Sequence, residues 1–152
     1  MPSPTYTLAE TFRLSNRVTL RLLCALTGEQ LGHAANPRAR SIADQFAHLY
    51  GVRASWLEAC AKSKLPKLPK DALGGDVLAR ALEESAEAVA RLLESAEAAG
   101  KLPNFPRGPA AFLGYLIAHE AHHRGQILLA LKHAGMPVPK ETAFALWEWG
   151  KL

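Results

Sequence analysis

Apolar side chains recur along the chain at intervals of three and four residues, and this periodicity predicts long amphipathic helices. Residues that commonly begin or end helices mark the ends of these helices. Ser41 suits the N-cap of a helix, Pro109 suits the first position of a helix, and Gly100 suits the residue that follows the last turn of a helix. No segment alternates apolar and polar residues for long enough to predict a strand. The expected helices span about residues 7–26, 41–61, 76–99 and 109–134.

The connections between these helices predict how they are arranged. Residues 62–75 carry Pro66, Pro69 and the pair Gly74-Gly75, and the segment is longer than a tight turn between helices requires. It suits a crossover from one end of a helix bundle to the other. The connection after the first helix, around residues 27–37, is expected to be irregular. We therefore expect an all-α four-helix bundle, with residues 141–152 forming a short capping helix.

Composition places the chain among ordinary globular proteins. Its 152 residues, 49% of them hydrophobic, fit a single domain over residues 1–152. No apolar run is long enough to span a membrane and no secretory signal is visible, so we expect a cytoplasmic protein without a membrane partner. Cys24 and Cys60 both fall inside helical patterns and are expected to be reduced core thiols.

The charge of the chain gives no indication of a nucleic-acid partner. The formal net charge is +4, but the basic residues are spread along the chain. The densest run, residues 62–70, alternates lysines with leucines and prolines and has no aromatic side chains on which bases could stack. This run is better interpreted as a solvated linker, and no nucleic acid is expected to bind.

The fourth predicted helix carries two histidines on its apolar face. His119 and His123 are four residues apart, so their rings lie about one turn apart on the same side. Phe112, Leu116 and Ile127 fall on that side too, and the histidines therefore point into the core. A polar ring on an apolar face costs free energy unless a metal ion or a hydrogen bond satisfies it.

A third histidine favours the metal. His48 lies on the core-facing stripe of the second predicted helix together with Gln45 and Trp56. Facing helices of a bundle commonly build metal sites from their inward side chains, and three imidazoles with a water form an open zinc site. The alternative is that His48, His119 and His123 are separate core residues held by hydrogen bonds. Together the three favour one divalent metal ion.

The same segment also matches the zinc-peptidase pattern His-Glu-x-x-His at residues 119–123. In that pattern the glutamate, here Glu120, acts as a general base on metal-activated water. A peptidase is a poor interpretation, because the longer downstream pattern is missing and a helical bundle offers no strand edge to a peptide. The remaining histidines, His33, His122 and His133, are expected at the surface or just outside the site.

Two segments together resemble a known family. They are residues 119–127, His-Glu-Ala-His-His-Arg-Gly-Gln-Ile, and the upstream segment 43–49, Ala-Asp-Gln-Phe-Ala-His-Leu. The chain resembles the DinB family of metalloenzymes over nearly its whole length, including the aromatic C-terminal segment 146–150. The resemblance implies an up-down-down-up four-helix bundle and a metal held by His48, His119 and His123. It implies zinc or nickel as the metal, with iron or manganese as alternatives.

The resemblance also implies partners and reactions. Many members form homodimers, and some transfer sulfur groups with low-molecular-weight thiols, whereas others resemble hydrolases. Glu120 is interpreted as a general base or as a hydrogen-bond partner of a neighbouring helix, and Arg124 as a binder of an anionic substrate group or as a surface ion-pair residue. Gln126 would orient a ligand or satisfy a buried group.

Three functions remain open from the sequence. The first is a metalloenzyme acting on a small molecule, by thiol S-transfer or by hydrolysis. The second is a metal-binding or small-molecule-binding stress-response module without turnover. The third is a structural or DNA-associated stress protein whose histidines are core residues.

Overall fold

The computed structural model describes residues 6–71 and 73–152, and these residues form helices joined by loops. Within them no strand is present, so the all-α fold class predicted from the sequence is confirmed. Five of the α-helices lie in the main body and the sixth belongs to the C-terminal segment, which ends in a 3-10 turn at Trp149–Lys151. The α-helices are α1 (Leu8–Cys24), α2 (Gly28–Gly32), α3 (Ile42–Ala61), α4 (Gly75–Ala99), α5 (Pro109–His133) and α6 (Lys140–Ala145).

Local sequence signals fix the ends of the long helices. At the start of α3 the Ser41 hydroxyl accepts from the Asp44 backbone N–H, and the Asp44 carboxylate accepts from the Ser41 N–H. Helix α4 ends at Gly100, whose φ of 69° is a left-handed conformation that glycine adopts without steric cost. Pro109 opens α5, where its missing N–H is not needed. These helix ends agree with those predicted.

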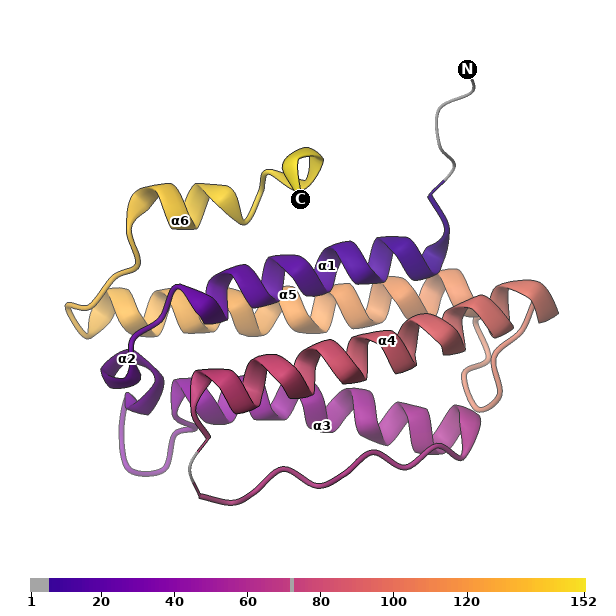
Figure 1. Ribbon diagram of the computed structural model, residues 1–152, viewed down its shortest axis with the longest axis horizontal. Coiled ribbons are helices and arrows are strands. Elements are labelled where there is room, and N and C mark those ends of the chain that lie inside the picture. Colours follow the sequence, from indigo (N-terminus) through magenta and orange to yellow (C-terminus); the bar gives the residue numbers. More distant parts are fainter. Residues whose placement is uncertain (1–5, 72) are drawn as a thin grey trace.

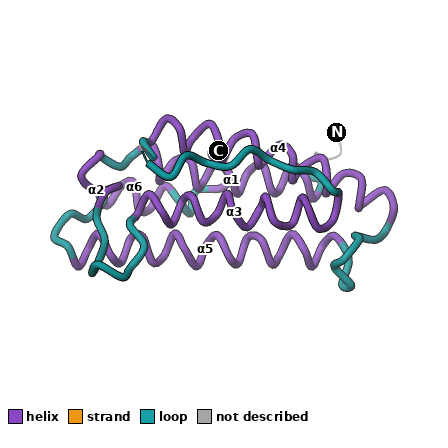
Figure 2. Tube along the Cα trace, turned by 90° about the horizontal axis from the view of Figure 1, so that it is seen from below, coloured by secondary structure: helices purple, strands orange, loops and turns teal. Residues whose placement is uncertain are grey.

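The four long helices lie side by side (Figure 1). In that view α1 and α5 run in one direction and α3 and α4 in the other. The segment between α3 and α4 travels back along the length of α3, and it is the long loop in Figure 2. Helices α1 and α3 each pack against both α4 and α5, which encloses the core between all four. Phe12, Phe46 and Phe112 are completely buried there.

Two parts of the chain differ from the sequence-based expectation. The connection after α1, which was expected to be irregular, contains a short helix, α2. Thr27 and Gln30 stabilise its first turn by capping it with reciprocal hydrogen bonds. Cys24 is exposed at the C-terminal end of α1, so only Cys60 is a core thiol. In the described residues no helix is long and apolar enough to cross a membrane.

Candidate metal centre

Three histidines meet between α3 and α5. One nitrogen from each of His48, His119 and His123 lies within 4.8 Å of the other two. His48 comes from the middle of α3, and the other two come from successive turns of α5. His123 is buried, while His48 and His119 are half-buried, so the cluster lies at the edge of the core with a side toward solvent. The structure thus brings together the three residues that the sequence selected.

The spacing of the rings suits a shared metal ion. The Nε2 atoms of His48 and His119 are 3.3 Å apart. Two nitrogens that each bind zinc at 2.0–2.1 Å with tetrahedral geometry are also separated by roughly 3.3 Å. The centroids of the His48 and His123 rings, and those of His119 and His123, are 4.7 Å apart. Three neutral imidazoles at this spacing form a donor set that divalent zinc and nickel both accept.

The hydrogen bonds around the cluster leave the metal-facing nitrogens free. The Nδ1 of His123 lies 3.2 Å from the side-chain oxygen of Gln45, a contact that fixes Nδ1 as the protonated nitrogen and leaves Nε2 as a lone-pair donor. The Nδ1 of His119 is buried and has no hydrogen-bond partner among the described residues, and its Nε2 is the nitrogen that faces His48.

The surroundings keep the rings neutral, as metal ligands must be. Burial, helped by the neighbouring His119 and His48, lowers the pKa of His123 to about 4. Burial also lowers the pKa of His48, helped by the positive charge of Arg40. For His119, burial lowers the pKa although the charge of Glu120 opposes the change. The rings are therefore available as neutral donors over the whole physiological pH range.

A cavity of about 280 Å³ reaches Gln45, the neighbour of His123, although none of the three histidines lines it. It is lined by Gln45, the residue that holds His123, and by Arg40, His33 and Gln126. The positive charge of Arg40 also lowers the pKa of all three rings of the cluster, as a smaller contribution than burial. A small anionic group in this cavity would lie near the Arg40 guanidinium.

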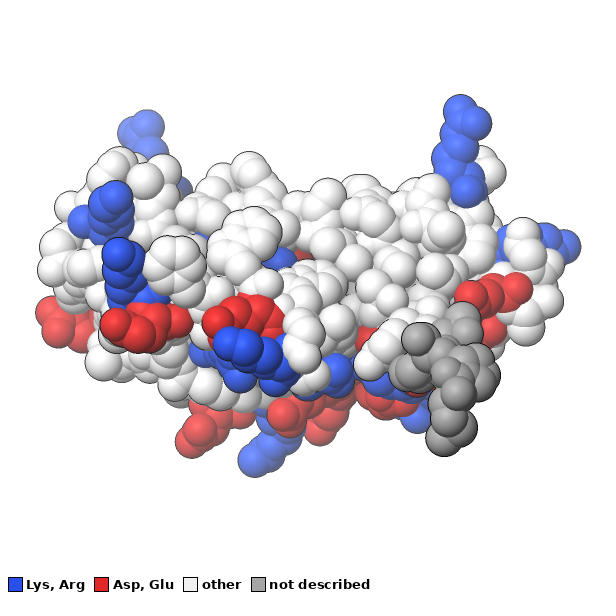
Figure 3. Space-filling view, turned by 90° about the horizontal axis from the view of Figure 1, so that it is seen from above, with Lys and Arg blue, Asp and Glu red and all other residues white. Residues whose placement is uncertain are grey.

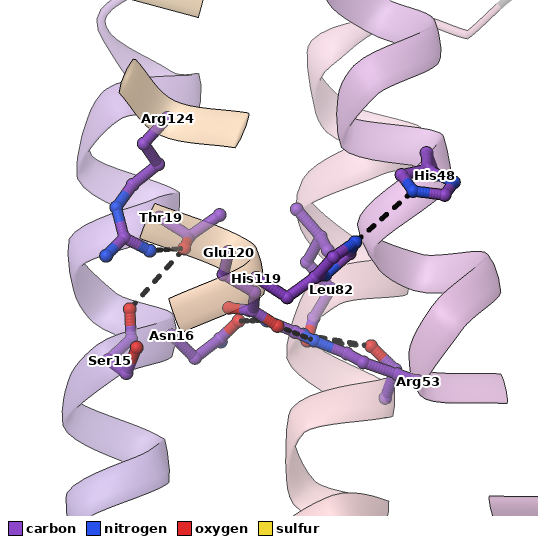
Figure 4. A network of polar contacts seen from close by, with 10 residues as sticks. Ser15, Asn16, Thr19, His48, Arg53, Leu82, His119, Glu120 and Arg124 are labelled. Atoms are coloured by element: carbon purple, nitrogen blue, oxygen red, sulfur yellow. Dashed lines mark hydrogen bonds and ion pairs between the residues drawn. The ribbon is translucent and has the colours of Figure 1, made fainter. Parts of the chain in front are cut away.

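A buried ionic network lies directly behind the cluster (Figure 4). The guanidinium of Arg53, from α3, donates two hydrogen bonds to the Glu120 carboxylate at 2.7 and 3.0 Å. Its remaining donors reach the side chains of Asn16 and Ser85 and the backbone oxygen of Leu82. All five N–H groups of Arg53 are used, and the network connects the four long helices.

The other residues singled out in the sequence lie elsewhere. Glu120 is 1% exposed, and both its carboxylate oxygens face Arg53, which agrees with its second interpretation as a partner of a neighbouring helix. Arg124 points toward α1, away from His48 (Figure 4). Gln126 and His122 bond to each other at the exposed surface, 3.0 Å apart. Of the two further histidines, His133 is exposed and His33 is half-buried.

Comparisons with protein families and with solved structures both give matches. The family model described as "DinB family" matches residues 1–150. The chain belongs to the DinB family. Among solved structures, a DinB-like protein from Bacillus cereus ATCC 10987 superposes with a TM-score of 0.68. It is 21% identical, and the match covers 87% of this chain and 93% of that chain, a likeness that shows the shared fold. No curated protein matches this DinB chain.

Sequence reasoning missed Arg53, a central residue of this DinB chain. The predicted core-facing stripe of α3 included Leu49 and then continued through Val52 and Trp56, but Val52 and Trp56 are only half-buried. The centre of the buried face runs through Leu49, Arg53 and Leu57, which are spaced four residues apart. The sequence did contain a signal for this ion pair. It places a charged side chain at a core position of α3 and a glutamate on the core face of another helix.

Proposed function

We propose that the chain binds one divalent metal ion through His48, His119 and His123. The observation that carries this proposal is the convergence of three neutral imidazoles with Nε2 atoms of His48 and His119 3.3 Å apart. Zinc and nickel are the leading ions, and iron or manganese are the alternatives, because imidazole donors accept all of them. Membership of the DinB family supports the same ligand set.

We further propose that this site performs chemistry on a small molecule, with thiol S-transfer as the leading reaction and hydrolysis as the second. A bound divalent ion held by neutral ligands lowers the pKa of a coordinated thiol or water and so supplies a nucleophile near neutral pH. The chain's own residues would keep the three ligand rings in the correct orientation and protonation state. Gln45 fixes the tautomer of His123, and the apolar surroundings keep the three rings deprotonated.

The position of Arg40 favours a substrate or thiol that carries a negative charge. Its charge helps to lower the pKa of all three rings, and it lines the 280 Å³ cavity that Gln45, the neighbour of His123, also lines. A thiolate or a carboxylate in this cavity would be attracted by the guanidinium. A low-molecular-weight thiol that carries a carboxylate is therefore the cosubstrate that we expect.

Glu120 remains a predicted general base, but its contacts support a different role. A general base must reach the proton that it accepts, and both carboxylate oxygens of Glu120 are bonded to Arg53. We propose that Glu120 instead fixes the helix that carries His119 and His123. The ion pair ties α5 to α3, the two helices that supply the ligands.

A screen of metal-loaded protein tests the reaction. Glutathione and simpler thiols are offered together with electrophiles, and ester substrates are offered alone, while thiol consumption and acid release are followed. Metal-dependent turnover in the wild type that is lost in His48→Ala supports the enzyme. If no thiol or ester reacts, and the metal-free protein binds the same compounds equally well, the chain is a binding module without turnover.

The homodimer is a second proposal, about assembly. Phe144 is 60% exposed and Trp147 is 83% exposed, and both belong to the C-terminal segment. Large aromatic side chains exposed together commonly mark a protein-binding surface. We propose that a second copy of the chain covers them.

A further inference from the structure

Arg124 is a buried cation that the metal site does not use. Its side chain is nine-tenths buried and points toward α1, where Nη1 donates to the Thr19 hydroxyl at 2.9 Å (Figure 4). In the parts of the chain that the structure describes, its guanidinium makes no other hydrogen bond. Arg53, by contrast, has all five of its N–H groups bonded. Arg124 therefore retains donor capacity for a ligand.

The buried charges near Arg124 do not balance. Arg53, Glu120 and Arg124 are all buried, which gives two cations and one anion. Both oxygens of Glu120 already bond Arg53. An uncompensated buried charge is costly, so a second anion beside Arg124 would be stabilised.

A cavity of about 440 Å³ opens at Arg124, between α5 and the C-terminal segment. Its other walls are apolar and include Leu128, Leu146 and Trp149. Figure 3 looks onto this side of the molecule and shows a broad central area without charged side chains. The volume is in the range of small-molecule sites, which combine apolar walls with a few polar groups that orient the ligand.

We propose that this cavity binds a monocarboxylate with an apolar body, its carboxylate on Arg124 and its chain against Leu128, Leu146 and Trp149. A carboxylate matches the planar fork of a guanidinium, and one cation balances one negative charge. A phosphate would need further donors, and among the residues that the structure describes Arg124 alone brings a charge to the cavity wall. The site is separate from the histidine cluster, because Arg124 and His48 lie on opposite sides of α5 (Figure 4).

Calorimetric titration with octanoate and 1-octanol tests the proposal, because the two probes share a chain and differ in charge. Metal-loaded wild-type protein should bind octanoate at least tenfold more tightly than octanol. The His48→Ala variant should bind octanoate within twofold of the wild type, since the candidate metal centre plays no part. Equal affinity for the two probes, no octanoate binding, or loss of octanoate binding in His48→Ala would each overturn the proposal.

Variants of Arg124 locate the carboxylate. Arg124→Met should weaken octanoate binding at least tenfold and change octanol binding less than twofold, because it removes the charge and keeps a long side chain. Arg124→Lys should retain a preference for octanoate of at least threefold. A folded Arg124→Met variant that binds octanoate like the wild type contradicts the assignment.

A matched pair at Gly125 tests the cavity even if Arg124 variants fail to fold. Gly125 lines the cavity, and a Cβ placed on it meets no atom within 4 Å. Gly125→Ala should leave octanoate binding within twofold of the wild type. Gly125→Leu should weaken it at least tenfold, because the larger side chain occupies the ligand's volume. Equal binding by both variants would show that octanoate binds elsewhere.

Discussion

Arg53 and Glu120 form a completely buried, bidentate ion pair between α3 and α5, with N···O distances of 2.7 and 3.0 Å. The two side chains are 0% and 1% exposed. Glu120 directly follows His119 in the chain, and the ion pair joins the two helices that carry the candidate metal ligands. Its geometry therefore bears on both the stability of the fold and the position of the histidines.

Breaking this ion pair should destabilise the protein strongly. Arg53→Met leaves the Glu120 charge buried without its partner, and such a loss costs about 3–5 kcal/mol. Urea denaturation followed by circular dichroism measures the free energy of unfolding. The double variant Arg53→Met/Glu120→Leu should be more stable than Arg53→Met alone, because no unpaired charge remains. A double variant that loses the sum of the two single effects would show that the side chains do not interact.

Glu120→Gln distinguishes the two roles weighed for this residue. If Glu120 positions α5, the variant should lose about 2–4 kcal/mol of stability, and turnover at temperatures where it stays folded should fall less than about tenfold. If Glu120 is the general base, turnover should fall by roughly 10²–10⁴-fold with the metal still bound. Parallel denaturation and rate measurements on the metal-loaded variant decide between them.

The stability of the metal-free protein should fall as the solution becomes acidic. The unfolded chain takes up protons on its histidines near pH 6.5, whereas burial holds the pKa of His123 at about 4 in the folded state. Between these two pH values the unfolded state binds more protons, so the free energy of unfolding decreases on the order of 1–3 kcal/mol as the pH falls. Above pH 6.5 this contribution is complete and constant.

Denaturation of the metal-free protein at a series of pH values measures this effect. His123→Gln, which cannot titrate, should show a smaller loss between pH 6.5 and 4.5 than the wild type does. Parallel curves for the two proteins would mean that His123 is not responsible. The metal should also stay bound to lower pH than free imidazoles would allow, because protons compete weakly for rings with lowered pKa values.

Gln45 should affect metal affinity without touching the ion. Its side-chain oxygen lies 3.2 Å from Nδ1 of His123 and orients that ring. Gln45→Leu removes the contact and should weaken metal binding by roughly 10–100-fold, as losses of such outer contacts commonly do. Competition with a chromogenic chelator measures the affinity, and Gln126→Leu serves as the control because Gln126 bonds the exposed His122. Equal affinities for both variants would remove Gln45 from the site.

The association of the chain gives a further prediction. Light scattering at micromolar concentration should give twice the chain mass of 16.5 kDa. Phe144→Ser should weaken the dimer at least tenfold, and Tyr6→Ser, which replaces an aromatic residue 67% exposed near the other end of the chain, should not. A monomer mass for the wild type would contradict the proposed homodimer.

The fold was predictable from the sequence because local signals and periodicity agreed. Ser41, Gly100 and Pro109 each stand where a long helix begins or ends, and the apolar stripes required helices to pack together. Helix α2 was not predicted, since its five residues are too few to show a period and only the Thr27–Gln30 capping pair defines it. The candidate ligands His119 and His123 were found by their spacing on one face, and His48 by its place on the apolar stripe of another helix.

The ionic network behind the site was not predicted, for a physical reason. Whether a charged side chain at a core position is paired depends on residues distant in the chain: Arg53 bonds Asn16, Ser85 and Glu120 on three other helices. Helical periodicity predicts which side of its own helix a residue occupies. It does not predict which side chain of another helix will contact that residue. The same limit applies to Arg124, whose burial depends on α1 and the C-terminal segment.

The metal content of purified protein tests the central proposal most directly. Mass spectrometry of wild-type protein equilibrated with zinc or nickel should give about one ion per chain, and His48→Ala should retain less than about 0.2, because two imidazoles hold an ion far more weakly than three. His122→Ala, which removes an exposed histidine of the same helix, should bind like the wild type. Undiminished metal in His48→Ala, or none in the wild type, would contradict the three-histidine site.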